Sequence, residues 1–341
     1  MRRCIQLAQN GLCNTAPNPM VGAVIVCDGK IIGEGYHIRC GEAHAEVNAI
    51  RSVKEPSLLK RSTIYVSLEP CAHYGKTPPC ADLIIEKQIP RIVIGCQDPF
   101  AKVAGRGIQK LKDAGREVIV GVLEEDCKNL IRRFVTFHSL HRPYITLKWA
   151  ESADKHIDKC RKDGKPVILS TPLTSMLVHK RRAEHSAIMV GTHTAELDNP
   201  SLTVRNWQGQ SPVRIVIDRQ QRLSPSLHLF DDSIRTLVFT GQPHAAFPNT
   251  EYIVIDFQQN ILPQIMQHLY AQGLQSLLVE GGSYLLQSFI NAELWDEIFV
   301  EESPLKLFSG VKAPEIGNKI PYVNEQYFGR NFRHYIATRL G

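Results

Sequence analysis

Long apolar runs are absent from this sequence of 341 residues. The longest, such as Val21–Cys27 and Ser276–Val279, are far shorter than the roughly 20 residues of a membrane-spanning helix. The N-terminus, Met1–Gln6, carries basic residues but lacks the apolar core of a signal peptide. The sequence therefore predicts a cytoplasmic protein with no membrane partner.

The sequence also lacks the signs of a disulfide framework and of intrinsic disorder. The nine cysteines are an odd number and crowd into the first half of the chain, which favours free thiols or a metal site in a reducing compartment. Apolar residues make up 43% and charged residues 22%, so disorder is excluded for the bulk of the chain. The length predicts two domains, or one large one.

The sequence has no block of Lys and Arg long enough to serve as a nucleic-acid-binding arm. Residues 1–142 nevertheless hold 20 Lys or Arg against 14 Asp or Glu, whereas residues 143–341 hold 20 of each. This excess is either scattered over a solvated surface or indicates an anionic ligand. We expect a small phosphorylated substrate and no nucleic-acid partner.

Strand-like and helix-like segments alternate through the first part of the chain, which predicts a layered α/β sheet. Asp28-Gly29 lies between two apolar runs and predicts a tight hairpin turn. The predicted strands are 21–26, 30–35, 63–68, 91–96 and 117–122, and the predicted helices are 44–51, 79–87 and 107–114.

Residues 138–143 interrupt this alternation, and Pro143 is typical of a boundary. We therefore predict two α/β domains, residues 1–142 and 143–341. In the second, the predicted strands are 144–149, 187–191, 213–218, 236–240, 276–280 and 297–300. Its predicted helices are 173–183, 261–271 and 284–291.

The pattern that indicates chemistry most strongly is His44-Ala-Glu46 followed by Cys71 and Cys80. One His and two Cys supply three zinc ligands and leave the fourth position open for water, which is typical of a catalytic site. Bound zinc makes hydroxide available near neutral pH. Glu46 lies two residues after His44, where a carboxylate can accept a proton from water and pass it to a leaving amine.

This pattern resembles that of zinc nucleobase deaminases, except that eight residues rather than two separate the cysteines. A structural zinc, or thiols without metal, is the alternative. The long insert, Pro70-Cys-Ala-His-Tyr-Gly-Lys-Thr-Pro-Pro-Cys80, is similar to that of the RibD/RibG family of riboflavin-biosynthesis deaminase–reductases. The segments 16–22, 33–37 and 97–108 fit the same family.

The resemblance implies an N-terminal cytidine-deaminase-like α/β/α domain and a homo-oligomer. It also implies that water replaces the 2-amino group of 2,5-diamino-6-(5-phosphoribosylamino)pyrimidin-4-one, with zinc on His44, Cys71 and Cys80 and with Glu46 as the catalytic proton shuttle. The substrate-binding residues expected in this domain are Asn18, His37, His73 and Lys76. His73 and Lys76 suit a ribose phosphate, and Asn18 can pair with a pyrimidine edge, although each also suits a turn or a solvated surface.

In the second half, Glu280-Gly281-Gly282-Ser283 places two glycines between a predicted strand and helix, where backbone N–H groups can hold a phosphate. The fuller Gly-x-Gly-x-x-Gly pattern is absent, so simple turn formation is the alternative. This half resembles the family's reductase, which implies a dihydrofolate-reductase-like fold and NADPH as the cofactor. The resemblance assigns Thr194, Asp198, Gly282 and Ser283 to NADPH, and Arg182, Leu202, Arg205 and Glu280 to the substrate.

The chain departs from the family pattern at Lys155, Ile168 and Ser175. Lys155 stands where the family has glycine, which matters if the backbone there needs a positive φ. We expect a bifunctional enzyme that first deaminates and then reduces the ribosylamino group to ribitylamino. A deaminase with a degenerate, non-catalytic reductase-like domain and a nucleic-acid-editing zinc deaminase remain as alternatives.

Overall fold

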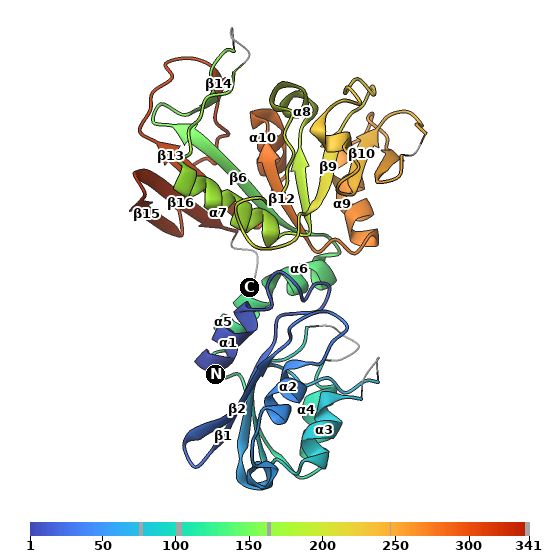
Figure 1. Cartoon of the computed structure of the whole chain (residues 1–341), viewed down its shortest axis with the longest axis vertical. Helices are drawn as coiled ribbons and strands as arrows, with labels where there is room; N and C mark the ends of the chain where they lie inside the picture. Colours follow the sequence, from blue (N-terminus) through green and yellow to red (C-terminus); the bar gives the residue numbers. More distant parts are fainter. Residues whose placement is uncertain (75–77, 100–103, 162–164, 246, 338–341) are drawn as a thin grey trace. The chain divides into compact units, whose positions relative to one another are not determined.

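The computed structural model describes the chain except for residues 75–77, 100–103, 162–164, 246 and 338–341. Two compact units, Met1–His141 and Arg142–Gly341, make up the chain and are coloured from blue to green and from green to red in Figure 1. In the described part of the chain, no helix is both long and apolar enough to cross a membrane.

The first unit is built on a five-stranded sheet with the order β2-β1-β3-β4-β5. β1 and β2 form an antiparallel hairpin, and β3, β4 and β5 run parallel to one another. Asp28 and Gly29 at the hairpin turn have φ values of 50° and 75°, so the predicted tight turn is confirmed. The strands are β1 (Gly22–Cys27), β2 (Lys30–Tyr36), β3 (Thr63–Leu68), β4 (Arg91–Cys96) and β5 (Glu117–Val120).

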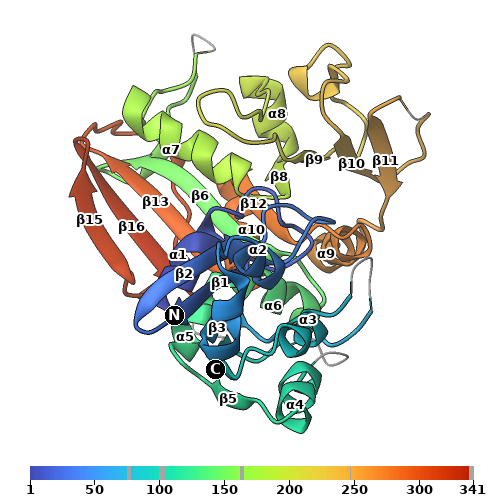
Figure 2. The same ribbon diagram turned by 60° about the horizontal axis from the view of Figure 1, so that its bottom comes forward.

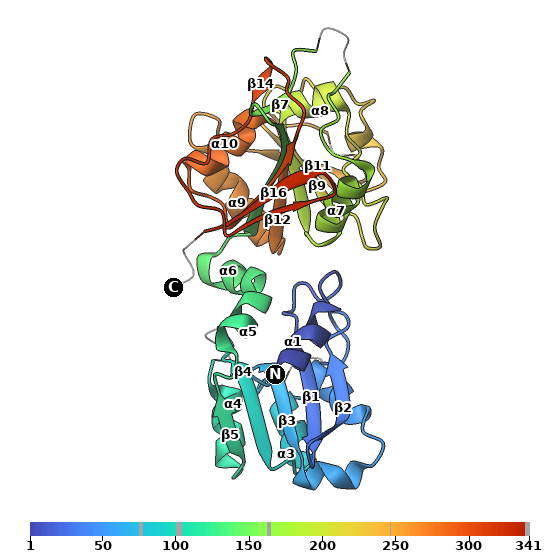
Figure 3. The same cartoon turned by 90° about the vertical axis from the view of Figure 1, so that its left-hand side faces the viewer.

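Helices cover both faces of this sheet, which gives the predicted three layers (Figure 1). Figure 3 looks onto a face of the sheet, with the strands side by side. On one face α3 contacts both α2 and α4, and on the other α1 and α5 pack together. Apolar side chains of the first group fill a core with Ile25, Ile64 and Ile92 of the strands. The helices are α1 (Arg2–Gln9), α2 (Ala45–Arg51), the 3-10 helix η1 (Pro56–Arg61), α3 (Cys80–Glu86), α4 (Arg106–Asp113), α5 (Glu124–Leu130) and α6 (Arg132–Leu140).

Four connecting segments leave this sheet at the same edge. Gly22 at the start of β1 pairs with Tyr36 at the end of β2, and the ends of β3 and β4 meet where Leu68 pairs with Cys96. Because β1 is antiparallel to β3, all four positions belong to one edge. The segments are residues 10–21, 37–44, 69–79 and 97–105. Residues that are distant in sequence are thereby brought to one place.

The second unit contains a nine-stranded sheet with the order β11-β10-β9-β8-β12-β6-β13-β16-β15 (Figure 2). The strands from β11 to β13 run parallel, whereas β16 and β15 form an antiparallel hairpin at one edge. The strands are β6 (Tyr144–Ser152), β8 (Ala187–Val190), β9 (Val213–Ile217), β10 (Thr236–Thr240), β11 (Thr250–Val254), β12 (Ser276–Gly281), β13 (Glu297–Ser303), β15 (Val323–Tyr327) and β16 (Arg330–Ile336). A separate pair, β7 (His156–Asp158) and β14 (Val311–Lys312), is antiparallel.

Alternate side chains of these strands enter apolar cores on opposite faces of the sheet. Met189 and Leu277 pack with α9 (Ile261–Ala271) and α10 (Ser283–Asn291), whereas Ile188 and Leu278 pack with α8 (Thr192–Asp198). α7 (Pro172–Ala183) begins with a Thr171 capping box, and a 3-10 helix, η2, spans His228–Phe230. The predicted α/β fold class is confirmed.

Each strand and helix that the sequence predicts has a counterpart in the structure, with ends that differ by a few residues. Several further elements, most of them short, were not predicted. They are α1, α5, α6, α8, η1, η2, β7, β11, β14, β15 and β16.

Candidate metal centre and candidate cofactor cavity

His44, Cys71 and Cys80 come together at the shared edge of the first unit. Their ligand atoms lie within 4.8 Å of one another. Nδ1 of His44 is 3.6 Å from Sγ of Cys71 and 3.4 Å from Sγ of Cys80. A tetrahedral zinc with ordinary Zn–S and Zn–N bond lengths separates such atoms by about 3.6 Å. The residues therefore fit zinc as three protein ligands.

Helix starts hold these ligands in place. His44 is the N-cap residue of α2, and Cys80 is the first residue of α3. The backbone N–H of Cys80 donates to Sγ of Cys71 at 3.3 Å, and the N–H of Ala81 donates to the Cys71 carbonyl at 3.1 Å. The first turn of α3 thus fixes both the backbone and the sulfur of Cys71.

The pKa values of the Cys71 and Cys80 thiols are shifted in opposite directions. A hydrogen bond from the Cys80 thiol, together with His44 and the Cys80 backbone N–H, lowers the pKa of Cys71 to about 4. The same contact with Cys71, and burial, raise the pKa of Cys80. The contact between the two sulfurs therefore favours a thiolate on Cys71 and keeps the proton on Cys80. Zinc binding would release that proton, because zinc binds thiolates.

Glu46 lies in the first turn of α2 with its side chain buried. Burial, and then the Cys71 charge, raise the pKa of Glu46 to about 7. A carboxyl group with a pKa near neutrality can both accept and return a proton. The position of Glu46, two residues beyond His44 in the first turn of α2, supports the predicted role of a proton shuttle.

Asn18 and His37 form a hydrogen-bonded pair beside His44. Nδ1 of His37 lies 3.1 Å from the Ala43 carbonyl, so this nitrogen carries the proton, and Nε2 accepts from the Asn18 side-chain amide at 3.1 Å. The ring of His37 meets that of His44 edge-on, with centroids 5.4 Å apart. The side chain of Asn48 donates to the carbonyls of Tyr36 and Ala43 and holds the connecting segment.

The other two predicted substrate contacts of this unit are less defined. His73 is exposed in the segment between Cys71 and Cys80. Lys76 falls outside the described residues. Their predicted contact with a phosphate stays a prediction.

Sequence reasoning missed the role of Glu69, which directly precedes Pro70-Cys71. Its carboxylate is only 4% exposed and accepts four backbone N–H groups from the segment after β4. Because backbone groups carry no residue signature, these partners could not be read from the sequence. The signal that the sequence did offer was an acidic residue directly after the predicted strand 63–68.

In the second unit, a cavity of about 670 Å³ brings together Thr194, Asp198, Glu280, Gly282 and Ser283. These residues include all four that were predicted to contact NADPH. They come from α8, the end of β12 and the start of α10. The volume falls within the range of small-molecule and cofactor sites.

The two glycines of this cavity are required by close approach. A Cβ on Gly281 would lie 2.9 Å from Cγ2 of Thr194, and Gly282 has a φ of 76° with Thr194 Oγ1 only 3.2 Å from its would-be Cβ. Gly282 is also the N-cap residue of α10, where free backbone N–H groups can bind a phosphate.

Several polar groups around this cavity are already paired with one another. Arg182 makes a two-pronged ion pair with Glu280, at 3.0 and 2.6 Å. Burial alone would raise the pKa of Glu280, but the Arg182 charge and hydrogen bonds lower it overall. Asp198 pairs with Arg161 at 2.6 Å.

Lys148, which the sequence analysis did not single out, also lines the cavity from β6. Burial lowers its pKa, whereas the neighbouring carboxylates of Glu280 and Glu301 oppose that shift. Lys148 therefore adds a cationic group between two acidic ones at the wall of this cavity.

The remaining predicted residues lie apart from the cavity lining. Leu202 packs in the apolar core, and Arg205 donates to Thr203 Oγ1 at 2.8 Å. Among the departures from the family pattern, Ile168 is 80% exposed at the cavity and Ser175 is half-buried in α7. Lys155 has a φ of 62°, so this position does adopt the backbone conformation that favours glycine.

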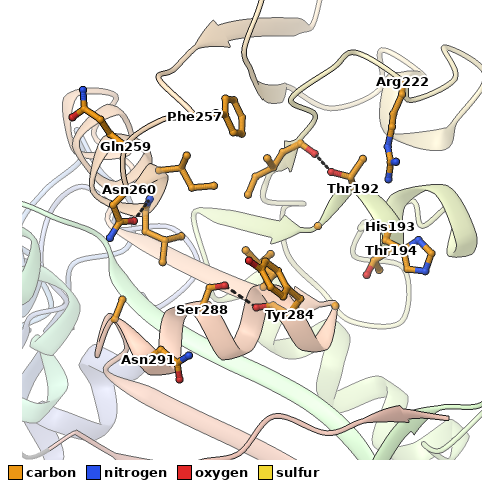
Figure 4. Close-up of a pocket in the computed structure, with 17 residues that line it drawn as sticks. Thr192, His193, Thr194, Arg222, Phe257, Gln259, Asn260, Tyr284, Ser288 and Asn291 are labelled. Carbon is orange, nitrogen blue, oxygen red and sulfur yellow. Dashed lines mark hydrogen bonds between the residues drawn. The ribbon is translucent and has the colours of Figure 1, made fainter.

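A second cavity of about 880 Å³ adjoins the first, and His193, Thr194, Gly282 and Tyr284 line both. Figure 4 shows Arg222 and Phe257 on other parts of its wall. Arg222 forms an ion pair with Glu196 at 3.0 Å, and both side chains are partly exposed. The two cavities together offer space for a ligand longer than either one.

Comparisons with known sequences match each half of the chain to a different family model. Residues 1–96 match the cytidine and deoxycytidylate deaminase zinc-binding region. Residues 143–308 match the RibD C-terminal domain.

Whole-chain relatives agree with both matches. Riboflavin biosynthesis protein RibD of Bacillus amyloliquefaciens is 36% identical over 93% of this chain and 86% of its own length. RibD of Escherichia coli is 36% identical over 92% of this chain and 89% of its own length.

A solved structure from Thermotoga maritima is described as a diaminohydroxyphosphoribosylaminopyrimidine deaminase/5-amino-6-(5-phosphoribosylamino)uracil reductase. It is 38% identical, with a TM-score of 0.88 over 98% of this chain and 96% of its own. RibD of Acinetobacter baumannii has 31% identity and a TM-score of 0.88, over 99% of this chain and 98% of its own.

Proposed function

The chain belongs to the RibD family of riboflavin-biosynthesis proteins and is a bifunctional enzyme with a zinc-binding deaminase domain and an NADPH-using reductase domain, and on that premise we propose what each site acts on. The first unit hydrolyses the 2-amino group of 2,5-diamino-6-(5-phosphoribosylamino)pyrimidin-4-one. The second unit reduces the ribosylamino group of the product to ribitylamino. The convergence of His44, Cys71, Cys80 and buried Glu46 is the observation that supports this proposal most strongly.

His44, Cys71 and Cys80 would hold the zinc, which supplies an activated water molecule when bound. Glu46 takes up the proton of the attacking water and returns it to the departing amino group, so that ammonia leaves. Its pKa of about 7, raised by burial, suits both transfers.

Asn18 and His37 orient the pyrimidine in this proposal. Because His37 Nε2 accepts from the Asn18 amide, the Asn18 carbonyl oxygen is left for a donor group on the substrate. His73 and Lys76 contact the ribose phosphate.

In the reductase unit, NADPH supplies the hydride when bound. The Gly281-Gly282 turn and the start of α10 hold a phosphate of the cofactor, with Thr194 and Asp198 beside it. The ion pair of Arg182 and Glu280, with Lys148 next to it, orients the sugar chain of the substrate. Arg205 and Leu202 stay as predicted contacts from the segment after α8.

The second cavity takes the adenosine half of NADPH, because it continues from the first across Thr194 and Gly282. Arg222 then faces the additional phosphate that distinguishes NADPH from NADH. An Arg222→Met variant tests this assignment. The KM for NADPH should rise several-fold while turnover with NADH stays unchanged, and an equal change for both cofactors would contradict it.

Product mass analysis tests the proposed function directly. Purified protein is incubated with the diaminopyrimidine substrate and NADPH, and the products are separated by mass. A product both deaminated and reduced supports both assignments. A product that is only deaminated would favour the alternative of a degenerate reductase domain, and unchanged substrate with zinc present would direct attention to a nucleic-acid substrate. The cytoplasmic location and the homo-oligomer stay predictions.

A further inference from the structure

One carboxylate, that of Glu69, fastens the segment after β4 to the end of β3. Its Oε2 accepts the backbone N–H of Asp98 at 3.2 Å and of Gly105 at 2.9 Å. Its Oε1 accepts the N–H of Gly107 at 2.8 Å and of Ile108 at 3.3 Å. A buried carboxylate is costly unless it is fully hydrogen-bonded, and these four donors meet that need.

This arrangement presses the start of α4 against Pro70. A Cβ on Gly107 would lie 1.9 Å from the Pro70 carbonyl oxygen, so no larger residue fits there without movement. Gly105, the N-cap residue of α4, has a φ of 76°. Arg106 lies between these two glycines and is exposed. Its backbone is therefore held directly beside the Pro70-Cys71 segment.

The Glu69 carboxylate does not hold the metal ligands. Cys71 is fixed by the N–H groups of Cys80 and Ala81, which belong to the first turn of α3. The four N–H partners of Glu69 all belong to residues 98–108. Loss of the carboxylate should therefore displace Arg106 while leaving the metal site in place.

Two backbone N–H groups in the first turn of α4, those of Gly107 and Ile108, donate to the Glu69 carboxylate. These two N–H groups are therefore not available to an anion at this edge of the sheet, and the charged group that the start of α4 offers is the Arg106 side chain. The first half of the chain carries the whole excess of positive charge, and the segment after β4 leaves the sheet at the same edge as those bearing Asn18, His44 and Cys71.

We infer that Arg106 binds the phosphate of the deaminase substrate and that Glu69 is the positioning residue that holds it at the site. This inference rests on the proposed function, since it concerns the phosphorylated substrate of the same unit. Arg106 acts by its charge, and Glu69 acts only through the turn that carries Arg106.

The test measures kcat and KM for deamination in the full-length, zinc-loaded protein, with the phosphorylated substrate and with its dephosphorylated counterpart. Arg106→Met should raise KM for the phosphorylated substrate about tenfold, with kcat within twofold and no change for the dephosphorylated one. Glu69→Gln replaces one acceptor oxygen by a donor, so it should raise the same KM by a similar factor. The double variant should be no worse than the worse single variant.

Three controls separate positioning from general damage. Lys112→Met removes the same charge from the far end of α4 and should leave KM unchanged. Zinc content and reductase turnover report whether each unit remains folded. Arg106→Lys, which keeps the charge, should recover most of the affinity.

Each alternative outcome has a definite meaning. Wild-type protein that fails to deaminate the substrate overturns the proposed function itself. Active wild-type protein with unchanged KM in Arg106→Met overturns the role of Arg106. A fall in kcat or zinc content in Glu69→Gln, with KM unchanged, would show that Glu69 supports the metal site instead and would also overturn the inference.

Discussion

The deaminase unit and the reductase unit differ in how the polar side chains of their candidate sites are arranged. In the first, three ligand atoms lie within 4.8 Å of one another, and the lowered pKa of Cys71 favours the thiolate form that zinc binds. In the second, Arg182 is paired with Glu280 and Asp198 with Arg161. The first site therefore brings together side chains that suit one cation, whereas the polar side chains of the second are paired with one another. We therefore expect substitutions in the first site to affect zinc binding and deamination, and substitutions in the second to affect stability and reduction.

Removal of a zinc ligand should give the largest effect and confine it to the first unit. In Cys71→Ala the ion loses a thiolate that the structure holds ready, so zinc content and deamination should both fall to background. Reductase turnover on the deaminated substrate should persist. Metal analysis and the two separate assays check this, and a matched loss of reductase activity would contradict the independence of the units.

Glu46→Gln should slow deamination by about a hundred- to ten-thousandfold, because the proposed proton shuttle is lost. Zinc should remain bound, since Glu46 is not among the three ligand residues. Paired measurements of zinc content and kcat distinguish this variant from Cys71→Ala. Retention of near-normal kcat would mean that another group moves the proton.

Breaking the ion pair of the second unit should damage stability as well as turnover. In Glu280→Gln the largely buried side chain of Arg182 loses its charged partner, which should destabilise the reductase unit by about 3 kcal/mol. Calorimetry should show a lower transition for this unit only. The double variant Arg182→Met/Glu280→Leu, which removes both charges, should recover stability but not reduction. A cost for Glu280→Gln below about 1 kcal/mol would show that the pair is effectively solvated.

Lys155→Gly should have the smallest effect. Glycine relieves the strain of a φ of 62°, worth about 1 kcal/mol, but removes the ion pairs of Lys155 with Glu151 and Glu302. Because the Lys155 side chain is about half exposed, those pairs are weak and the two changes should nearly cancel. Unfolding and NADPH turnover should both stay close to wild type. A large gain in turnover would instead identify Lys155 as a cause of weakened reductase activity.

The contrast between the units also explains what the sequence could reveal. The short spacing of His44 and Glu46 and the residue types of Cys71 and Cys80 predicted the metal centre, because zinc chemistry requires those side chains. The hairpin at Asp28-Gly29 was predictable from the backbone angles that these residues tolerate.

Other interactions join residues that are distant in sequence, so no local sequence pattern predicts them. The four N–H partners of Glu69 are backbone groups, which carry no residue signature. The acidic neighbours of Lys148, Glu280 and Glu301, lie on β12 and β13, and only the order of strands in the sheet brings them beside it. The β15–β16 hairpin escaped prediction because β16 is rich in polar residues. The pairing of Asp198 with Arg161 likewise follows from tertiary structure alone.

The position of the metal ligands at two helix starts has a consequence for how the stability of each unit depends on zinc. Because His44 begins α2 and Cys80 begins α3, a single ion would tie together segments that are 36 residues apart. By linkage, each tenfold rise in free zinc above the dissociation constant adds about 1.4 kcal/mol to the stability of that unit and nothing to the other. Zinc scarcity would therefore expose the deaminase unit to unfolding and proteolysis while the reductase persists. Calorimetric scans at buffered zinc concentrations should show one transition that moves and one that does not, and two moving transitions would refute this uncoupled view.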